Sequence, residues 1–136
     1  GHRKLWGAQL ESNAIDVLEQ VGISDVSNAP VSSLTYIDQK RVELARALIS
    51  DPQLLLLDEW LAGLNPSELT IGIELINNLR SEGRTIIVVE HVMDAIRSLC
   101  DRCVVMNSGS KIAEGMPQDV LADDEVIRAY LGDEHA

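Results

Sequence analysis

The sequence predicts an α/β fold, in which a mostly helical segment precedes a parallel sheet. Residues 3–50 carry helical patterns, whereas residues 51–136 alternate strands with helices, which places a subdomain boundary between them. The continuous aliphatic run Leu54–Leu57 is typical of a strand buried on both faces of a parallel sheet. Successive strand–helix–strand units imply right-handed parallel crossovers.

The amino-acid composition indicates a globular protein and argues against several classes of partner. The 136 residues are 46% hydrophobic and 24% charged, as expected for one globular core. A net charge of −11 argues against binding to nucleic acid and to anionic lipid. No apolar run approaches ~18 residues and no signal-peptide pattern is present, so a cytoplasmic location is expected.

Two helices are predicted in the first segment. Ser12 or Asn13 is expected to cap the first helix and Gly22 to end it, with an inward face of Ile15, Leu18 and Val21. Thr35 followed by Asp38 predicts the start of the second helix, which should end before Pro52. Its inward residues are expected to be Val42, Ala45, Leu48 and Ile49, and its outward residues Lys40, Arg41, Glu43 and Arg46.

The second segment begins with a strand at Leu54–Leu57. Asn65, Pro66 and Glu68 together predict a capped helix start, and Gly83 predicts its end. The buried face of this helix is expected to comprise Leu69, Ile73, Ile76 and Leu79.

A β-branched run predicts a second strand at Thr85–Val89, which should neighbour the first. A helix through Ala95, Ile96 and Leu99 then leads to a strand at Cys103–Met106. Asn107–Ser110 predicts a hairpin turn into Lys111–Ala113. Short helices around Val120–Leu121 and Val126–Leu131 complete the pattern.

Polar residues that could do chemistry follow both strands of the predicted sheet. Asp58 and Glu59 come directly after the first strand, and His91 follows the second. Ligands bind at the carboxyl edge of such sheets, so these side chains should meet there. As structural alternatives, the two carboxylates could cap a helix at the strand end or form a solvated pair, and the histidine could be a helix cap.

Cys100 and Cys103 form a C-x-x-C pattern. Zinc binding would require a second pair of ligands, and redox chemistry a thioredoxin-like context, and the sequence offers neither. The two residues are therefore interpreted as buried or half-buried thiols.

Four ordered motifs together resemble the ATP-binding subunit of ABC transporters, specifically the branched-chain amino acid uptake type. Leu54–Glu59 resembles the Walker B strand, Ala62-Gly63-Leu64-Asn65 the D-loop, and His91 the switch histidine. Leu34-Thr35-Tyr36-Ile37-Asp38-Gln39 resembles the signature motif, and the tail from Ala113 to Gly132 resembles the ending of the branched-chain type. The resemblance implies a P-loop NTPase-like (RecA-like) sheet with a helical subdomain.

The resemblance also implies roles for these residues. Asp58 would hold Mg²⁺, Glu59 would act as the catalytic base or water-orienting group, and His91 would sense the γ-phosphate of ATP. The signature residues would bind nucleotide held by the opposite subunit of a dimer, using the positive end of their helix. Transmembrane permease subunits would be further partners, on the inner face of the cell membrane.

Several residues depart from the family pattern. Ile37 stands where the signature motif has its second glycine, Trp60 replaces the proline after Walker B, and Asn65 replaces the D-loop aspartate. These departures are expected to affect the rate of hydrolysis more than the fold, and a working variant is favoured.

The G-x-x-x-x-G-K-[ST] phosphate loop does not occur in these 136 residues. The chain is therefore interpreted as a C-terminal fragment of such a subunit, inactive alone. The family's Walker A strand would lie between the strands at Thr85–Val89 and Cys103–Met106, so its absence would leave unpaired edges that favour self-association. The alternative is a non-catalytic interaction or regulatory domain derived from this fold.

Overall fold

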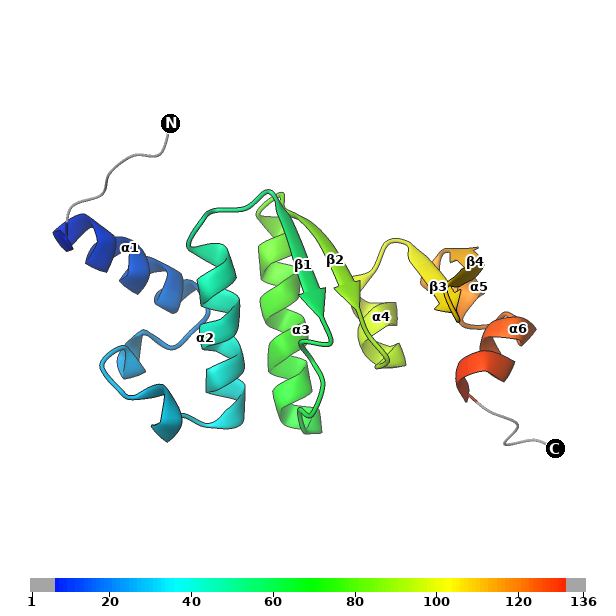
Figure 1. Cartoon of the computed structure of the whole chain (residues 1–136), viewed down its shortest axis with the longest axis horizontal. Coiled ribbons are helices and arrows are strands. Elements are labelled where there is room, and N and C mark those ends of the chain that lie inside the picture. The colour runs from blue at the N-terminus through cyan, green and yellow to red at the C-terminus, as the bar shows by residue number, and fades with distance from the viewer. Residues whose placement is uncertain (1–6, 132–136) are drawn as a thin grey trace. The chain divides into compact units, whose positions relative to one another are not determined.

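The computed structural model describes residues 7–131, which form two compact units that divide between Val88 and Val89. The first unit holds α1 (Gly7–Gln20), α2 (Tyr36–Leu48), β1 (Leu54–Asp58), α3 (Pro66–Ser81) and β2 (Thr85–Val89, whose last residue crosses the division), with 3₁₀ turns at Ser24–Val26 and Val31–Ser33. The second holds α4 (Met93–Leu99), β3 (Cys103–Asn107), β4 (Ser110–Gly115), α5 (Pro117–Val120), α6 (Asp124–Val126) and a π-helical turn at Ile127–Leu131. Figure 1 follows this order by colour. The boundary expected between residues 50 and 51 stays a prediction.

Helix α1 ends as predicted but does not begin as predicted. Ser12 and Asn13 lie inside the helix, so the predicted cap is wrong. The good helix formers Gln9, Leu10 and Glu11 continue the helix upstream of both residues. At the other end Gly22 has φ +82°, the amide of Gly22 donates to the carbonyl of Glu19 at 3.0 Å, and that of Ile23 to Leu18 at 2.9 Å. This is the Schellman arrangement, in which a left-handed glycine ends the helix.

Helix α2 starts at the predicted cap. The side chain of Thr35 accepts a hydrogen bond from the amide of Asp38 at 3.3 Å. Ala45 and Leu48 are buried as predicted, and so is Leu44. Ile49 is 50% exposed, because it lies past the last helical residue and off the packed face.

The predicted outward face of α2 is only partly correct. Glu43 and Arg46 are exposed, but Lys40 and Arg41 are half-buried. Arg41 lies against the end of α1, where its guanidinium donates to the carbonyl of Gly22 at 3.4 Å and to Asp38 at 3.2 Å. Long cationic side chains can cover apolar surface in this way while their polar heads keep partners.

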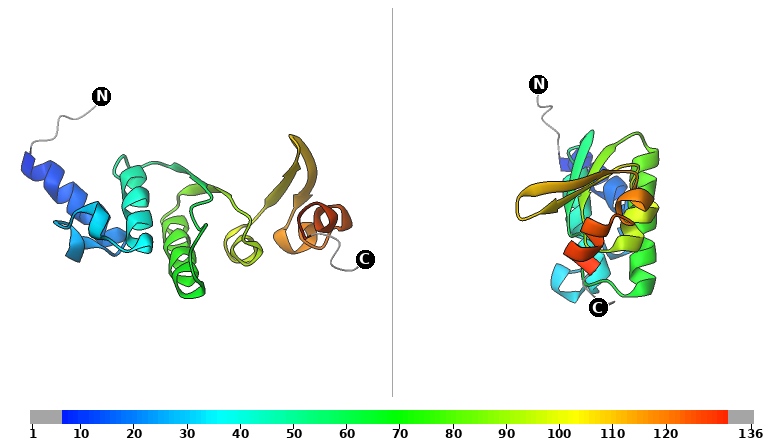
Figure 2. Two further views of the ribbon diagram at one scale, coloured as in Figure 1. Left: turned by 60° about the horizontal axis from the view of Figure 1, so that its bottom comes forward. Right: turned by 90° about the vertical axis from the view of Figure 1, so that its right-hand side faces the viewer.

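Strands β1 and β2 pair with each other, and their arrows run the same way in Figure 1. The prediction of two neighbouring parallel strands is therefore confirmed. The prediction that β1 is buried on both faces is wrong, because Leu55 and Leu57 are buried whereas Leu54 is 52% and Leu56 66% exposed. Among the described residues, α3 covers one face of the pair (Figures 1 and 2). The alternating burial of the strand residues shows that every second side chain points to the other face.

Helix α3 has the predicted reciprocal cap. The Asn65 side chain accepts from the amide of Glu68 at 2.9 Å, and the Glu68 carboxylate accepts from the amide of Asn65 at 3.2 Å. On the predicted buried face Ile76 and Leu79 are buried, and Leu69 and Ile73 are half-buried. Gly83 follows the helix with φ +90°.

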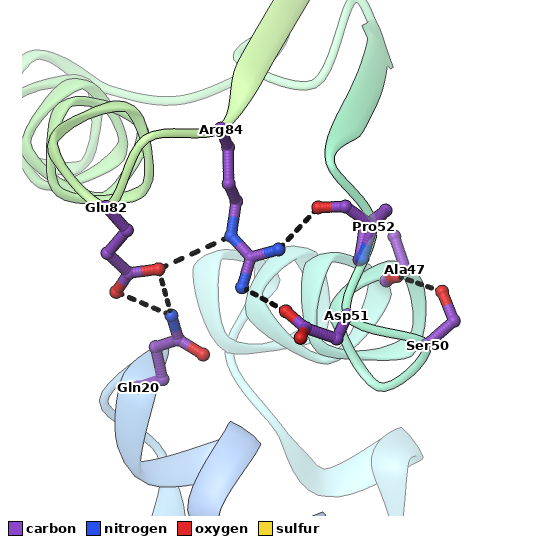
Figure 3. Close-up of polar contacts among 7 residues, drawn as sticks. All are labelled: Gln20, Ala47, Ser50, Asp51, Pro52, Glu82 and Arg84. Atoms are coloured by element: carbon purple, nitrogen blue, oxygen red, sulfur yellow. Dashed lines mark hydrogen bonds and ion pairs between the residues drawn. The ribbon is translucent and has the colours of Figure 1, made fainter.

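Arg84 joins the starts of the two strands (Figure 3). Its half-buried guanidinium donates to the carbonyl of Pro52 at 2.5 Å, to Asp51 at 3.0 Å and to Glu82 at 3.3 Å. Glu82 in turn accepts from the side-chain amide of Gln20 at 2.7 and 2.8 Å, which brings in the end of α1. The network fixes the end of the sheet opposite to the one that carries Asp58.

The second unit is built around the predicted hairpin. β3 and β4 pair antiparallel, with Cys103 opposite Gly115 and Asn107 opposite Ser110. The two turn residues, Ser108 and Gly109, have φ +49° and +82°, which a tight two-residue turn requires. The core of this unit comprises Ile96, Val105, Val120, Leu121 and Val126.

None of the helices in residues 7–131 is long and apolar enough to cross a bilayer.

Candidate active site

The carboxylates of Asp58 and Glu59 lie at the C-terminal end of β1. Asp58 is the last residue of the strand, and both side chains are exposed. Glu59 has φ +51°, a left-handed conformation that is uncommon outside glycine. The chain then folds into a tight turn, in which the amide of Ala62 donates to the carbonyl of Glu59 at 3.0 Å.

The turn is stabilised by the two residues that follow Glu59. Trp60 is 2% and Leu61 1% exposed, so both side chains are fully buried. A left-handed conformation costs a residue such as glutamate roughly 1–2 kcal/mol. Burial of a large apolar side chain contributes about 1.5–3 kcal/mol, so this pair can offset the cost. Strained backbone held by its surroundings is a feature of functional sites.

Helix α3 approaches the turn closely through a glycine. A Cβ at Gly72 would lie 2.6 Å from Leu61 Cδ2 and 3.3 Å from the Trp60 ring. A side chain at this position would therefore force the buried Leu61 side chain to move. The turn continues through Gly63, with φ +78°, to Asn65, which caps α3. Asn and Asp cap helices about equally well, so the replacement of the family aspartate preserves this local function.

The residues that resemble the signature motif form the start of α2. Leu34 is extended and its carbonyl accepts from the side chain of Gln39 at 3.1 Å. Thr35 caps the helix, and Asp38 pairs with Arg41 at 3.2 Å. Ile37 is half-buried, so part of its β-branched side chain is covered by protein. The 13-residue helix places its positive end at this motif.

The structure brings together residues that resemble the signature motif and residues that resemble the D-loop. The hydroxyl of Tyr36 donates to the carbonyl of Ala62 at 3.0 Å, and the indole N–H of Trp60 donates to the carbonyl of Lys40 at 3.0 Å. No local sequence pattern indicates either contact, because the partners are 26 and 20 residues apart.

His91 lies in the second unit, two residues after β2 ends, and is exposed. Its ring lies 6.4 Å from that of Tyr130, with the planes inclined at 37°, a distance at which aromatic rings interact. The hydroxyl of Tyr130 donates to the carbonyl of Met106. The expected approach of His91 to Glu59 concerns two different units and stays a prediction.

Cys100 and Cys103 are half-buried, as predicted. Burial raises the pKa of the Cys103 thiol, which favours its neutral form. Since the thiolate is the nucleophile and the metal ligand, this side chain is poorly suited to either role at neutral pH. Among residues 7–131, no group of three or more His, Cys, Asp or Glu side chains is arranged to hold a metal.

Asp58 nevertheless fits one kind of metal site. Mg²⁺ is commonly held by one or two carboxylates together with substrate phosphates, rather than by a cage of protein ligands. Asp58 offers an exposed carboxylate at a strand end, with that of Glu59 next to it. The donor atoms suit Mg²⁺ that arrives with a phosphorylated substrate.

Two family models match the chain. One, described as ABC transporter, matches residues 3–62, and the other, described as branched-chain amino acid ATP-binding cassette transporter, matches residues 110–136.

Similar proteins include the high-affinity branched-chain amino acid transport ATP-binding protein LivG of Escherichia coli strain K12, which is 42% identical over 117 residues. BraF of Pseudomonas aeruginosa, of the same description, is 40% identical over 117 residues. Each alignment covers 85% of this chain and 46% of the relative. The Nod factor export ATP-binding protein I of Rhizobium meliloti is 38% identical over 130 residues, covering 93% of this chain and 39% of that protein. The chain therefore spans less than half the length of these relatives.

Solved structures show the same fold. The ADP conformation of MJ1267, an ATP-binding cassette of an ABC transporter, superposes with a TM-score of 0.86 at 28% identity, over 96% of this chain and 52% of that one. CbiO1 of Clostridium perfringens, part of an ABC transporter complex, gives a TM-score of 0.80 at 34% identity, over 93% and 51%. The described α/β architecture is thus that of a nucleotide-binding cassette.

Proposed function

Because this chain belongs to the ABC transporter ATP-binding proteins, we propose that it forms part of the ATP-hydrolysing subunit of an importer for branched-chain amino acids or related amides. The observation that carries the proposal is the 42% identity to LivG over 85% of the chain, because this alignment spans most of the chain rather than one motif. The second family model, over residues 110–136, supports the branched-chain type independently.

Each site residue has a chemical role in this proposal. The Asp58 carboxylate would hold Mg²⁺, which when bound neutralises charge on the β- and γ-phosphates. The Glu59 carboxylate would orient or deprotonate the attacking water, and His91 would donate a hydrogen bond to the γ-phosphate. The exposure of Asp58 and Glu59 at the strand end, and the left-handed backbone at Glu59, support this assignment.

A second subunit would supply the other half of each nucleotide site. Leu34–Gln39 would face nucleotide bound by the opposite subunit, and Ala62–Asn65 would form the D-loop between them. The positive end of α2, with Thr35 as its cap, supports binding of an anion at this motif. Ile37 is the residue that could hinder a close approach of phosphate to the backbone.

The proposed partners follow from the same family. The subunit would dock on transmembrane permease subunits at the inner face of the cell membrane. Nucleic acid is not a partner in this proposal, because the chain carries a net charge of −11.

A phosphate-release assay tests the activity. The 136-residue chain should hydrolyse ATP no faster than background, because the phosphate loop that positions ATP is absent from its sequence. A full-length subunit should hydrolyse ATP, and Glu59→Gln should reduce its turnover by orders of magnitude while ATP still binds. Ser98→Ala, which removes an exposed hydroxyl on α4, is the matched control and should leave turnover unchanged.

Two results would contradict the proposal. A full-length subunit without ATPase activity, but with intact fold, would favour the non-catalytic alternative. Turnover by the 136-residue chain that Glu59→Gln abolishes would mean that the phosphate site is supplied differently.

We also propose that the chain self-associates when it is alone. Alternate side chains of β1 and β2 leave an apolar face exposed, since Leu54, Leu56, Ile87 and Val89 are each 52–66% exposed. Sheet edges and faces of this kind promote pairing between copies. Light scattering at micromolar concentrations should detect a dimer or larger species, and Leu56→Lys should shift it toward monomer. A monomer for the unchanged chain would count against the idea.

A further inference from the structure

The turn that carries Glu59 is attached to one face of α2 by two hydrogen bonds that run in opposite directions. Tyr36, in the first turn of the helix, donates its hydroxyl to the carbonyl of Ala62 at 3.0 Å. Trp60, in the turn, donates its indole N–H to the carbonyl of Lys40 at 3.0 Å. Tyr36 and Lys40 are four residues apart and therefore lie on the same helical face.

Side-chain packing reinforces both bonds. The ammonium of Lys40 lies 5.6 Å from the centre of the Tyr36 ring, a cation–π geometry that holds the ring over its own helix. A Cβ at Gly63 would lie 3.1 Å from the Tyr36 hydroxyl and 3.3 Å from its ring, so the turn passes directly against the tyrosine. Gly63 also has φ +78°, which a side chain would not readily adopt.

Trp60 makes the attachment rigid. Its side chain is 2% exposed, and its single N–H donor is satisfied by the carbonyl of Lys40. The indole ring also lies where α3 passes, since a Cβ at Gly72 would be 3.3 Å from it. A residue held on two sides in this way transmits displacement of α2 rather than absorbing it.

We propose that Tyr36 and Trp60 are positioning residues that fix the Glu59–Gly63 turn to the first turns of α2, so that the placement of the Glu59 carboxylate follows that of the helix. Glu59 is covalently next to Trp60 and has the left-handed φ of +51°, so its backbone is determined by the turn. Leu34–Gln39 are proposed to contact the nucleotide bound by the opposite subunit. Their helix thereby sets the position of the Glu59 carboxylate, which is proposed to act on the nucleotide bound by its own subunit. The inference rests on the proposed function only in the role given to Glu59.

The coupling itself is testable on the 136-residue chain without nucleotide. Tyr36→Phe removes the hydroxyl but keeps the ring against Gly63 and Lys40. We expect this change to shift the backbone amide signals of Glu59, Trp60 and Ala62 in a ¹⁵N–¹H correlation spectrum. Thr70→Val, which removes an exposed hydroxyl that donates to the carbonyl of Pro66 in the same unit, is the matched control and should leave the Glu59 signal in place.

Trp60→Phe provides a second variant, which removes the hydrogen bond that the turn donates to α2. It keeps an aromatic ring in the buried site and removes only the donor to Lys40, and it should move the Glu59 signal and the signals of α2 around Lys40. Unchanged Glu59 signals in a folded Tyr36→Phe chain would overturn the proposal. So would shifts of equal size in the Thr70→Val control.

The consequence for catalysis is measured in the full-length subunit. Tyr36→Phe should lower kcat about 10-fold and leave KM for ATP within about twofold, since small misplacement of a catalytic group affects the reaction more than binding. A loss of overall stability alone would lower the active fraction, and the thermal midpoint would fall with it. An unchanged kcat would overturn the proposal, whereas absence of ATPase activity in the unchanged subunit would count against the proposed function and leave the spectroscopic test to decide the coupling.

Discussion

The two faces of β1 differ in burial although both carry leucines. Leu55 and Leu57 are 3% and 7% exposed, whereas Leu54 and Leu56 are 52% and 66% exposed. The inner face is packed within the first unit, and the outer face leaves more than half of each leucine exposed. Residue type alone therefore does not determine a residue's energetic contribution, which depends on what its side chain contacts.

Alanine substitution along β1 tests this comparison most strongly. Leu55→Ala should destabilise the chain by about 2–5 kcal/mol, because it removes buried contacts and leaves a cavity. At high dilution, where association between copies is weak, Leu56→Ala should change stability by less than about 0.5 kcal/mol, because within one chain its side chain is already largely in water. Urea unfolding followed by circular dichroism measures both. Equal losses would mean that the outer face is covered in solution, most simply by a second copy of the chain.

Arginines provide the same comparison for a charged side chain. The Arg84 side chain is 13% exposed and donates to the carbonyl of Pro52, whereas that of Arg97 is 50% exposed and pairs with the exposed carboxylate of Asp94. Arg84→Ala should cost about 1–3 kcal/mol, because a half-buried carbonyl and two carboxylates lose a donor. Arg97→Ala should cost roughly 0–1 kcal/mol. Thermal unfolding of the two variants measures both losses of stability. A larger loss for Arg97→Ala than for Arg84→Ala would show that burial does not determine the contribution of these arginines.

Helix α3 offers a smaller contrast between two asparagines. Asn65→Ala should destabilise the chain by about 1 kcal/mol, because it removes the cap that accepts from the amide of Glu68. Asn65→Asp should be close to neutral, since aspartate caps equally well. Asn78, exposed near the end of the same helix, is the control, and Asn78→Ala should be neutral or slightly stabilising because alanine has the higher helix propensity. A destabilising Asn78→Ala of equal size would assign the effect to the helix rather than the cap.

The sequence predicted the features that depend on neighbouring residues. The strand at Thr85–Val89, the cap at Asn65 and the turn before Ser110 each follow from a few adjacent side chains. The exposed face of β1 was missed, because an aliphatic run does not reveal whether a second layer covers it.

The site shows the same limit. Asp58 and Glu59 were located by their position after a strand, but the left-handed conformation of Glu59 depends on how Trp60 and Leu61 are buried. The bonds from Tyr36 and Trp60 join residues more than a helix length apart in sequence, and no local pattern encodes them.

The smallest expected effect concerns an exposed carboxylate of the second unit. A hydrogen bond from Lys111, at 2.8 Å, lowers the pKa of Glu114, together with the positive charges of Lys111 and, more weakly, Arg102. Because the folded pKa lies below the unfolded one, the pair stabilises the hairpin above the unfolded pKa, and this contribution is lost as pH falls through the folded pKa.

An NMR titration of the Glu114 side-chain carboxyl can therefore separate the effects of the two cations on its pKa. Lys111→Gln should raise the pKa of Glu114 toward its ordinary value, because it removes both the charge and the ammonium donor. Arg102→Gln should raise it less, since its guanidinium lies 3.5 Å from the carboxylate and contributes only through charge. Exposed ion pairs contribute little to stability, so neither change should move the unfolding midpoint of the chain measurably at neutral pH. If Arg102→Gln shifted the pKa as far as Lys111→Gln, the hydrogen bond would not be the main cause.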